Sequence, residues 1–144
     1  FRSLMDADDP KDIFNTLYGD LKKNFHADRA VVRIFAKPSF IDSFATDEFA
    51  GRETAEESLF KSIIDKRLPL SGRMKRQQQV FLFGDDGDEI ASSVMIPLHG
   101  EEWGGILSIG SFDAEHFQAG MGIELLANLG EILSFVLKPW VEQA

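Results

Sequence analysis

Apolar residues recur at three- and four-residue spacing at both ends of the chain, which predicts a helix near each terminus. An Asp-Pro pair precedes the first stripe and is typical of a helix start, so we expect this helix to cover about residues 10–25. The second stripe, over residues 121–137, is the strongest helical pattern in the chain. We expect it to end before Pro139, because proline interrupts the helical hydrogen-bond ladder.

Two weaker helical patterns lie in the middle of the chain. Thr54 and Glu57 have the spacing of a capping box in front of an apolar stripe, which predicts a helix over about 55–66. A Gln-rich stretch between two glycines predicts a third helix over about 73–83, with Gly84 as its cap.

Runs of β-branched and aromatic residues predict the strands. The first run is AVVRIFA at 30–36, and a shorter extended piece at 40–45 can pair with it. The proline in LPLS at 68–71 allows only a short edge strand. Two longer runs, at 90–98 and 103–111, flank a polar turn and therefore predict a hairpin.

This order of elements predicts an α+β fold, because the hairpin requires antiparallel pairing and strands and helices do not alternate strictly. Both hairpin strands are apolar on both faces, which is typical of a sheet between two helical layers. We expect a central antiparallel β-sheet of about five strands, with the terminal helices on one face and the middle helices over the other. We further expect a single domain over residues 1–144, with residues 1–9 as an N-terminal tail or the remnant of an upstream helical region.

Composition then excludes several classes of protein. The 15 basic and 24 acidic residues give a net charge of −9, which argues against direct nucleic acid binding or attraction to anionic membranes. The absence of cysteine excludes a thiolate nucleophile, a disulfide scaffold and a thioether-bound chromophore. No apolar run approaches the roughly 18 residues of a membrane span, and the N-terminus lacks a signal-peptide pattern. We therefore expect a cytoplasmic protein with no membrane segment.

The chemistry-bearing residues form no recognisable catalytic or metal-binding motif. His26, His99 and His116 lack the paired spacing of metal ligands, and no serine lies in a GxSxG turn. Phosphate-binding glycine loops are also absent from the sequence. We therefore expect no catalytic residues, no metal and no cofactor, and hence a protein that is not an enzyme.

Three segments resemble the DUF484 family of bacterial GAF-like proteins. They are FQAGMGIELLANLGEIL at 117–133, WGGILSIGS at 103–111 and SGRMKRQQQVFLFG at 71–84. The resemblance covers nearly all of the chain from about residue 10. It implies a GAF-like fold, a sensory-module architecture with terminal helices on one face of the sheet and a ligand pocket on the other.

Arg33 is a charged residue within an apolar strand, where it must be paired, reach solvent or meet a ligand. In the hairpin, alternation places Ser93, Met95 and Ser108 on the face with the smaller side chains. A pocket bounded by these four residues would suit a small polar or anionic ligand. Structural pairing of Arg33 is the simpler interpretation, and a ligand contact is the alternative.

The charge of the chain inverts locally. Residues 61–76 contain six basic residues and one acidic residue, a net charge of +5 within a chain of −9. Solvated helix faces account for most such runs. The functional alternative is that Arg73, beside Gly72 at the start of a helix, contributes to binding an anion.

These patterns favour a non-catalytic sensory or regulatory module that binds an unidentified small ligand and signals through its terminal helices. The alternative is a ligand-free protein-interaction or dimerisation scaffold, in which side chains fill the pocket. We also expect a homodimer through the terminal helices, because their wide apolar stripes can leave a patch exposed. The residues expected in that patch are Phe14, Tyr18, Phe25, Phe135, Leu137 and Trp140.

Overall fold

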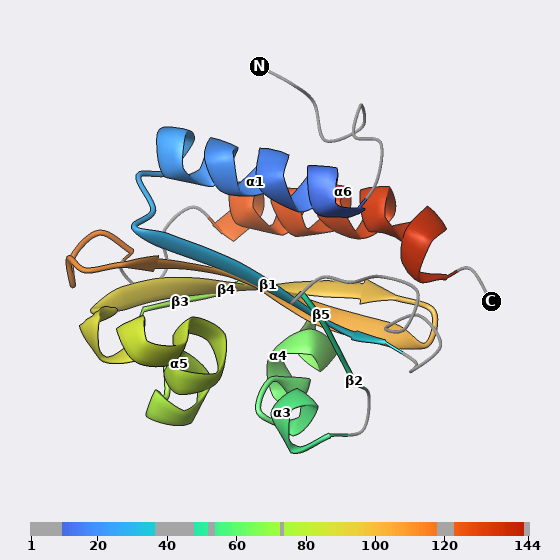
Figure 1. The fold of residues 1–144 in the computed structure, drawn as a ribbon, viewed down its shortest axis with the longest axis horizontal. Helices are drawn as coiled ribbons and strands as arrows, with labels where there is room; N and C mark the ends of the chain where they lie inside the picture. Colours follow the sequence, from blue (N-terminus) through green and yellow to red (C-terminus); the bar gives the residue numbers. More distant parts are fainter. Residues whose placement is uncertain (1–9, 37–47, 52–53, 73, 118–122, 143–144) are drawn as a thin grey trace.

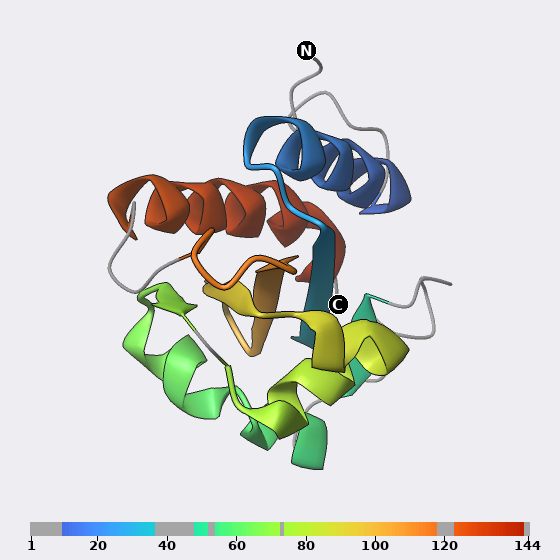
Figure 2. The same ribbon diagram turned by 90° about the vertical axis from the view of Figure 1, so that its left-hand side faces the viewer.

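The structure is a computed structural model that describes residues 10–36, 48–51, 54–72, 74–117 and 123–142. It has three layers, with the terminal helices above a β-sheet and the shorter middle helices below it (Figure 1). A second view shows the same two helical layers on opposite faces of the sheet (Figure 2). This is the predicted α+β architecture, and its layers match those of a GAF-like fold.

Five strands form one sheet in the order β2-β1-β5-β4-β3. Their bounds are Arg29–Ala36 for β1, Phe49–Gly51 for β2, Leu70–Gly72 for β3, Ser92–Gly100 for β4 and Trp103–Ser111 for β5. The hairpin of β4 and β5 and the short edge strand β3 are confirmed. The sheet is mixed rather than purely antiparallel, because β2 pairs parallel to β1. The expected extended piece at 40–45 lies outside the described residues.

The terminal helices are α1, Pro10–Asn24, and α6, Ile123–Val141. The expectation that Pro139 ends the second helix is wrong, because α6 continues through it. Pro139 lies in the last turn, so its missing N–H removes a single hydrogen bond of the ladder. Val141 beyond it is fully buried in the core, which holds this turn in place.

The middle helices are shorter than predicted. The expected helix over 55–66 is divided into α3, Ala55–Ser58, and α4, Lys61–Lys66. Between them the N–H groups of Leu59 and Phe60 donate to carbonyls three residues back, which tightens the chain, and Phe60 is fully buried. The third predicted helix is α5, Arg76–Phe83, followed by the 3₁₀ helix η2, Gly84–Glu89.

The sheet divides the core into two clusters. The predicted bulky face of the hairpin packs against α1 and α6, with Ile96 and Leu107 among its fully buried residues. The other face carries Phe35, Met95 and Ile106 and packs against the middle helices. Two members of the expected exposed patch, Phe14 and Leu137, are instead buried in the first cluster. Those two residues therefore complete the core of the monomer.

Gly130 lies where α6 approaches the sheet closely. A Cβ at this position would lie 2.7 Å from Ile96 Cγ2 and 3.0 Å from the carbonyl oxygen of Pro97, whereas a Cβ at Gly19 in α1 would meet nothing within 4 Å. We expect Gly130→Ala to lower the free energy of unfolding by about 1–3 kcal/mol through overpacking. The matched control Gly19→Ala should raise it by about 0.5–1 kcal/mol, because alanine is the better helix former. Urea unfolding measures both, and a Gly130→Ala protein as stable as the Gly19→Ala protein would contradict the close packing.

Candidate functional site

The sequence-predicted residues meet on one face of the sheet. Met95 lies directly opposite Ser108, and Ser108 lies opposite Val31 in β1. Directly opposed residues of antiparallel strands project to the same side, and Ser93 and Arg33 follow by alternation. All four therefore face the middle helices, as the sequence predicts. Arg73 lies outside the described residues.

Arg33 is partly buried, and its charge has partners within the chain. Its Nη1 donates to the carbonyl oxygen of Val32 at 2.8 Å. Its guanidinium also lies over the ring of Phe81, with Cζ 5.9 Å from the ring centroid. A carbonyl and an aromatic face both stabilise a cation, so the structural interpretation of Arg33 has direct support.

Aromatic side chains fill the space beneath Arg33. Phe35, Phe60 and Phe81 form a cluster with ring centroids 5.8–6.3 Å apart. Each ring comes from a different element, β1, the break between α3 and α4, and α5. The cluster therefore occupies part of the sheet face on which the alternation pattern predicts a pocket.

Ser108 remains a candidate ligand-binding residue. Its side chain is 0% exposed, and its Oγ has no hydrogen-bond partner among the described residues. The neighbouring Ser93 Oγ donates to the carbonyl oxygen of Gly72 at 3.4 Å. A buried hydroxyl without a partner costs about 1–3 kcal/mol, so Ser108 is the polar group on this face that a ligand could satisfy.

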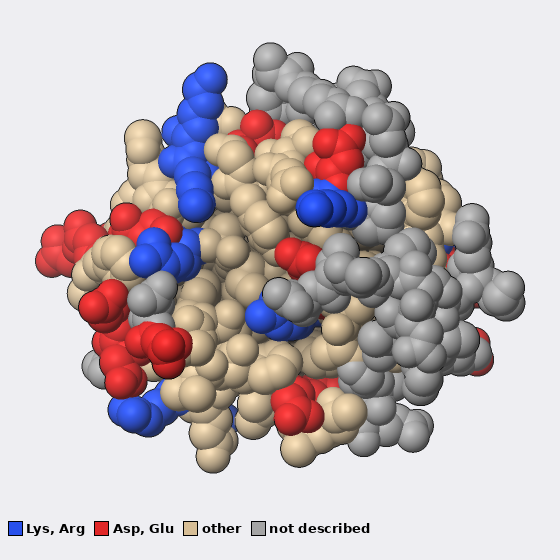
Figure 3. All heavy atoms as spheres, in the orientation of Figure 1, with Lys and Arg blue, Asp and Glu red and all other residues tan. Residues whose placement is uncertain are grey.

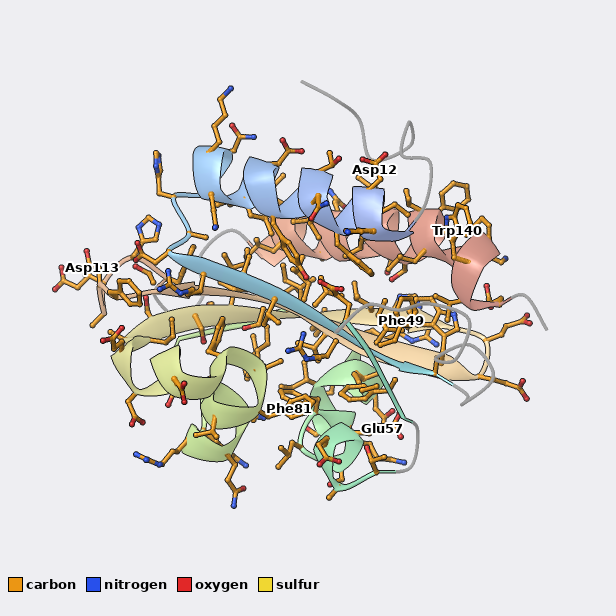
Figure 4. The ribbon with its side chains drawn as sticks, in the orientation of Figure 1. Asp12, Phe49, Glu57, Phe81, Asp113 and Trp140 are labelled. Carbon is orange, nitrogen blue, oxygen red and sulfur yellow. The ribbon has the colours of Figure 1, made fainter. Side chains whose placement is uncertain are left out.

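A groove of about 600 Å³ opens between α3 and α5. Leu59, Val80 and Phe81 form its apolar lining, with Glu56 and Arg76 at its margins. Figure 4 shows Phe81 below the sheet, between α5 and the helices α3 and α4. The surface over this region is largely uncharged, with isolated acidic and basic side chains around it (Figure 3). Phe81 thus belongs both to the groove and to the cluster that covers Arg33.

Two buried amides anchor α5 to neighbouring segments, one of them at the groove residue Leu59. Gln78 Nε2 donates to the carbonyl oxygen of Leu59 at 2.8 Å, and its Oε1 accepts from the backbone N–H of Lys75 at 3.1 Å. Gln79 Nε2 donates to the carbonyl oxygen of Ile90 at 2.9 Å. The sequence patterns do not mark Phe81 or either glutamine as a site residue. Their place within the predicted helix over 73–83 was visible, but the partners of the two glutamines, Leu59 and Ile90, are distant in sequence.

His99 and His116 form polar contacts within the fold. His99 Nε2 lies 2.9 Å from Glu131 Oε1, and His116 Nε2 donates to the carbonyl oxygen of Phe25 at 2.9 Å. Within the described ranges, no three His, Cys, Asp or Glu side chains gather in a way that could hold a metal ion. None of the helices in that part of the chain is long and apolar enough to span a membrane.

Tyr18 is also held inside the fold. Its hydroxyl donates to Glu48 Oε2 at 2.9 Å and accepts from the backbone N–H of Val32 at 3.2 Å. Burial, with a smaller effect of the Glu48 carboxylate, raises the pKa of Tyr18 well above its usual range. The hydroxyl therefore stays protonated and links α1 to β1 and the segment before β2.

Comparison with known proteins gives one family. The family model described as "Protein of unknown function, DUF484" matches residues 1–142. A search of curated proteins gives no match.

A comparison of the buried residues Ser92 and Ser108 tests whether the Ser108 hydroxyl lacks a hydrogen-bond partner. Ser92 Oγ donates to the carbonyl oxygen of Asp113 at 2.6 Å and accepts from the backbone N–H of Phe117 at 3.1 Å. We expect Ser92→Ala to lower the free energy of unfolding by about 1–3 kcal/mol, and Ser108→Ala to leave it unchanged or raise it by about 1 kcal/mol. Chemical denaturation of the two variants gives both values. A loss of stability at Ser108 equal to that at Ser92 would mean that the Ser108 hydroxyl has a partner in solution.

Proposed function

Because the chain belongs to the DUF484 family, whose description assigns no function, we propose a function from the geometry of the site. The protein is a non-catalytic GAF-like regulatory module that binds a small ligand in the groove between α3 and α5. Binding is transmitted through the sheet to the terminal helices α1 and α6.

The position of Phe81 carries this proposal. Its ring lines the groove on one side and lies against the guanidinium of Arg33 on the other. Rotation of this one side chain would extend the groove toward Arg33 and the unsatisfied hydroxyl of Ser108. The expected ligand therefore has an apolar body, which suits Leu59 and Val80, and one polar or anionic group.

The sheet supports transmission because it is a single layer between two cores. Met95 and Ile106 pack toward the middle helices, whereas Ile96 and Leu107, their neighbours in the same strands, pack toward the terminal helices. A displacement of β4 or β5 by a ligand therefore moves side chains in both cores, since packed interiors transmit strain. The sequence supports a non-catalytic role, because it offers neither cysteine nor a serine in a nucleophile turn.

A thermal-shift screen with small carboxylates and phosphates that carry an apolar group tests the binding site. A ligand that raises the melting temperature of the wild type should lose that effect in Arg33→Ala, because stabilisation follows occupancy and occupancy needs the guanidinium. Arg29→Ala is the matched control. Arg29 lies on the same strand and the same face, and its guanidinium also lies over a phenylalanine ring, that of Phe112 at 5.2 Å.

The expected pattern is a shift retained in Arg29→Ala and lost in Arg33→Ala. Phe81→Ala should strengthen binding of the same ligand or leave it unchanged, since it opens the path to Arg33. A screen in which all four proteins respond identically to every ligand would remove Arg33 from the site.

A separate observation favours a second candidate function, that of a dimerisation scaffold. The outer face of α6 exposes Leu125, Ile132 and Phe135, which are 62%, 49% and 64% accessible. They are seven and three residues apart, so they lie along one side of the helix. Exposed apolar stripes of this kind usually mark an interface. Of the residues expected in the patch, Phe135 lies on this stripe.

Charges beside the stripe favour a second copy of the chain as its partner. Glu124 lies near the start of α6 and Lys138 near its end, about four turns apart and on the same flank of the stripe. If two copies pack α6 against α6 in antiparallel orientation, Glu124 of each meets Lys138 of the other. The same contact is made twice, as twofold symmetry requires.

Light scattering over the micromolar range tests this dimer. We expect Ile132→Asp to raise the dissociation constant at least about tenfold, because it places a charge at the centre of the stripe. Val80→Asp, at a valine that is 48% exposed on α5, on the opposite face of the sheet from α6 (Figure 1), is the matched control and should not change it. Glu124→Lys should weaken the dimer, and Glu124→Lys with Lys138→Glu should restore it. A wild type that stays monomeric throughout that range would defeat the scaffold hypothesis.

A further inference from the structure

A hollow of about 320 Å³, separate from the groove, lies where the turn between β4 and β5 meets the C-terminal half of α6. Figure 1 shows the end of the hairpin below the last turns of α6. Trp103, Glu142, Arg67 and Lys138 are among the residues that line it. Trp103 and Arg67 also line an adjoining hollow of about 250 Å³. The two hollows therefore share Trp103 and Arg67 as lining residues.

Trp103 contributes a donor without an acceptor. Its side chain is 4% exposed, and its Nε1 is buried with no hydrogen-bond partner among the described residues. The indole packs against the backbone of Gly100, where any side chain would overlap Nε1. An indole N–H can only donate, so this group requires an acceptor. Trp103 is a lining residue of the hollow, so a ligand in the hollow is an acceptor that a small rotation of the indole brings within reach of this N–H.

Glu142 contributes an acceptor without a donor. Its Oε1 accepts from the backbone N–H of Glu101 at 2.9 Å, which ties the end of α6 to the hairpin turn. Its Oε2 is buried, and the described part of the chain offers it no partner. One carboxylate oxygen is thus fixed by the fold, and the other is left for a donor at the same hollow.

The charged side chains around the hollow are of both signs. Arg67, which caps α4 in a left-handed conformation, and Lys138 in α6 are exposed, and neither forms an ion pair with a described residue. Glu131 on α6 pairs with His99 across the hollow's edge. A purely anionic ligand would leave the Glu142 oxygen unsatisfied, and a purely cationic ligand would leave the Trp103 N–H unsatisfied.

The geometry points to a binding site for a small zwitterion, a free α-amino acid. Its carboxylate accepts from Trp103 Nε1 and is attracted by Arg67 and Lys138, while its ammonium group donates to Glu142 Oε2. This arrangement satisfies both buried polar atoms at once, and each of them is otherwise desolvated without a hydrogen bond. The volume of the hollow lies at the lower end of the range for small-molecule sites, roughly 300–1,000 Å³, which suits a ligand of this size.

Isothermal titration of the full chain with the proteinogenic amino acids, one at a time up to about 10 mM, tests this site. We expect at least one of them to bind. Trp103→Phe keeps the aromatic packing and removes the N–H. Glu142→Gln keeps the length of the side chain and removes the negative charge that would attract the ammonium group. Each variant should weaken binding by about tenfold or more, corresponding to about 1.4 kcal/mol for one hydrogen bond to a charged group.

Two control variants distinguish binding at this hollow from binding elsewhere on the protein. Glu115→Gln makes the same change at an exposed carboxylate just after β5, away from the hollow, and should bind as the wild type does. Arg33→Ala should also bind normally, so failure of the groove proposal and failure of this one are distinguishable. Binding of no amino acid, binding unaffected by both Trp103→Phe and Glu142→Gln, or acetate binding as tightly as the amino acid would each overturn the proposal.

Discussion

Burial of strand β5 on both faces along its whole length is the constraint on which the rest of this structure depends. A strand without a solvated face needs a helical layer on each side, since its apolar side chains alternate between the two. The long amphipathic helices α1 and α6 supply one layer. The short helices α3, α4 and α5 supply the other and leave gaps between them, because short elements cover a sheet less completely than two long ones.

The two layers therefore differ in what they can do. On the middle-helix side, three phenylalanine rings close the interior beneath Arg33, and a groove remains between α3 and α5. On the terminal-helix side, α6 buries one side of its surface and leaves Leu125, Ile132 and Phe135 outside. A groove suits a small ligand and a continuous apolar stripe suits a protein partner, so the two candidate functions belong to opposite faces of one sheet.

Unsatisfied polar atoms identify sites in a core that otherwise satisfies its polar groups. Buried Gln78, Gln79 and Ser92 all have hydrogen-bond partners. Ser108 Oγ, Trp103 Nε1 and Glu142 Oε2 do not have one among the described residues. Most buried polar groups in folded proteins are paired. These three atoms therefore indicate where a bound molecule would form the most favourable hydrogen bonds.

Local periodicity in the sequence was enough to identify most of the helices and strands, and it placed Arg33, Ser93, Met95 and Ser108 on a common face. Both results follow because a strand alternates every second residue and a helix repeats after 3.6. The parallel pairing of β2 with β1 and the position of Phe81 over Arg33 became visible only in the folded chain. The same holds for the side of α6 that stays exposed and for the hollow that Trp103 and Glu142 share. These features depend on which distant segments meet, and periodicity within one segment carries no information about the segment that packs against it.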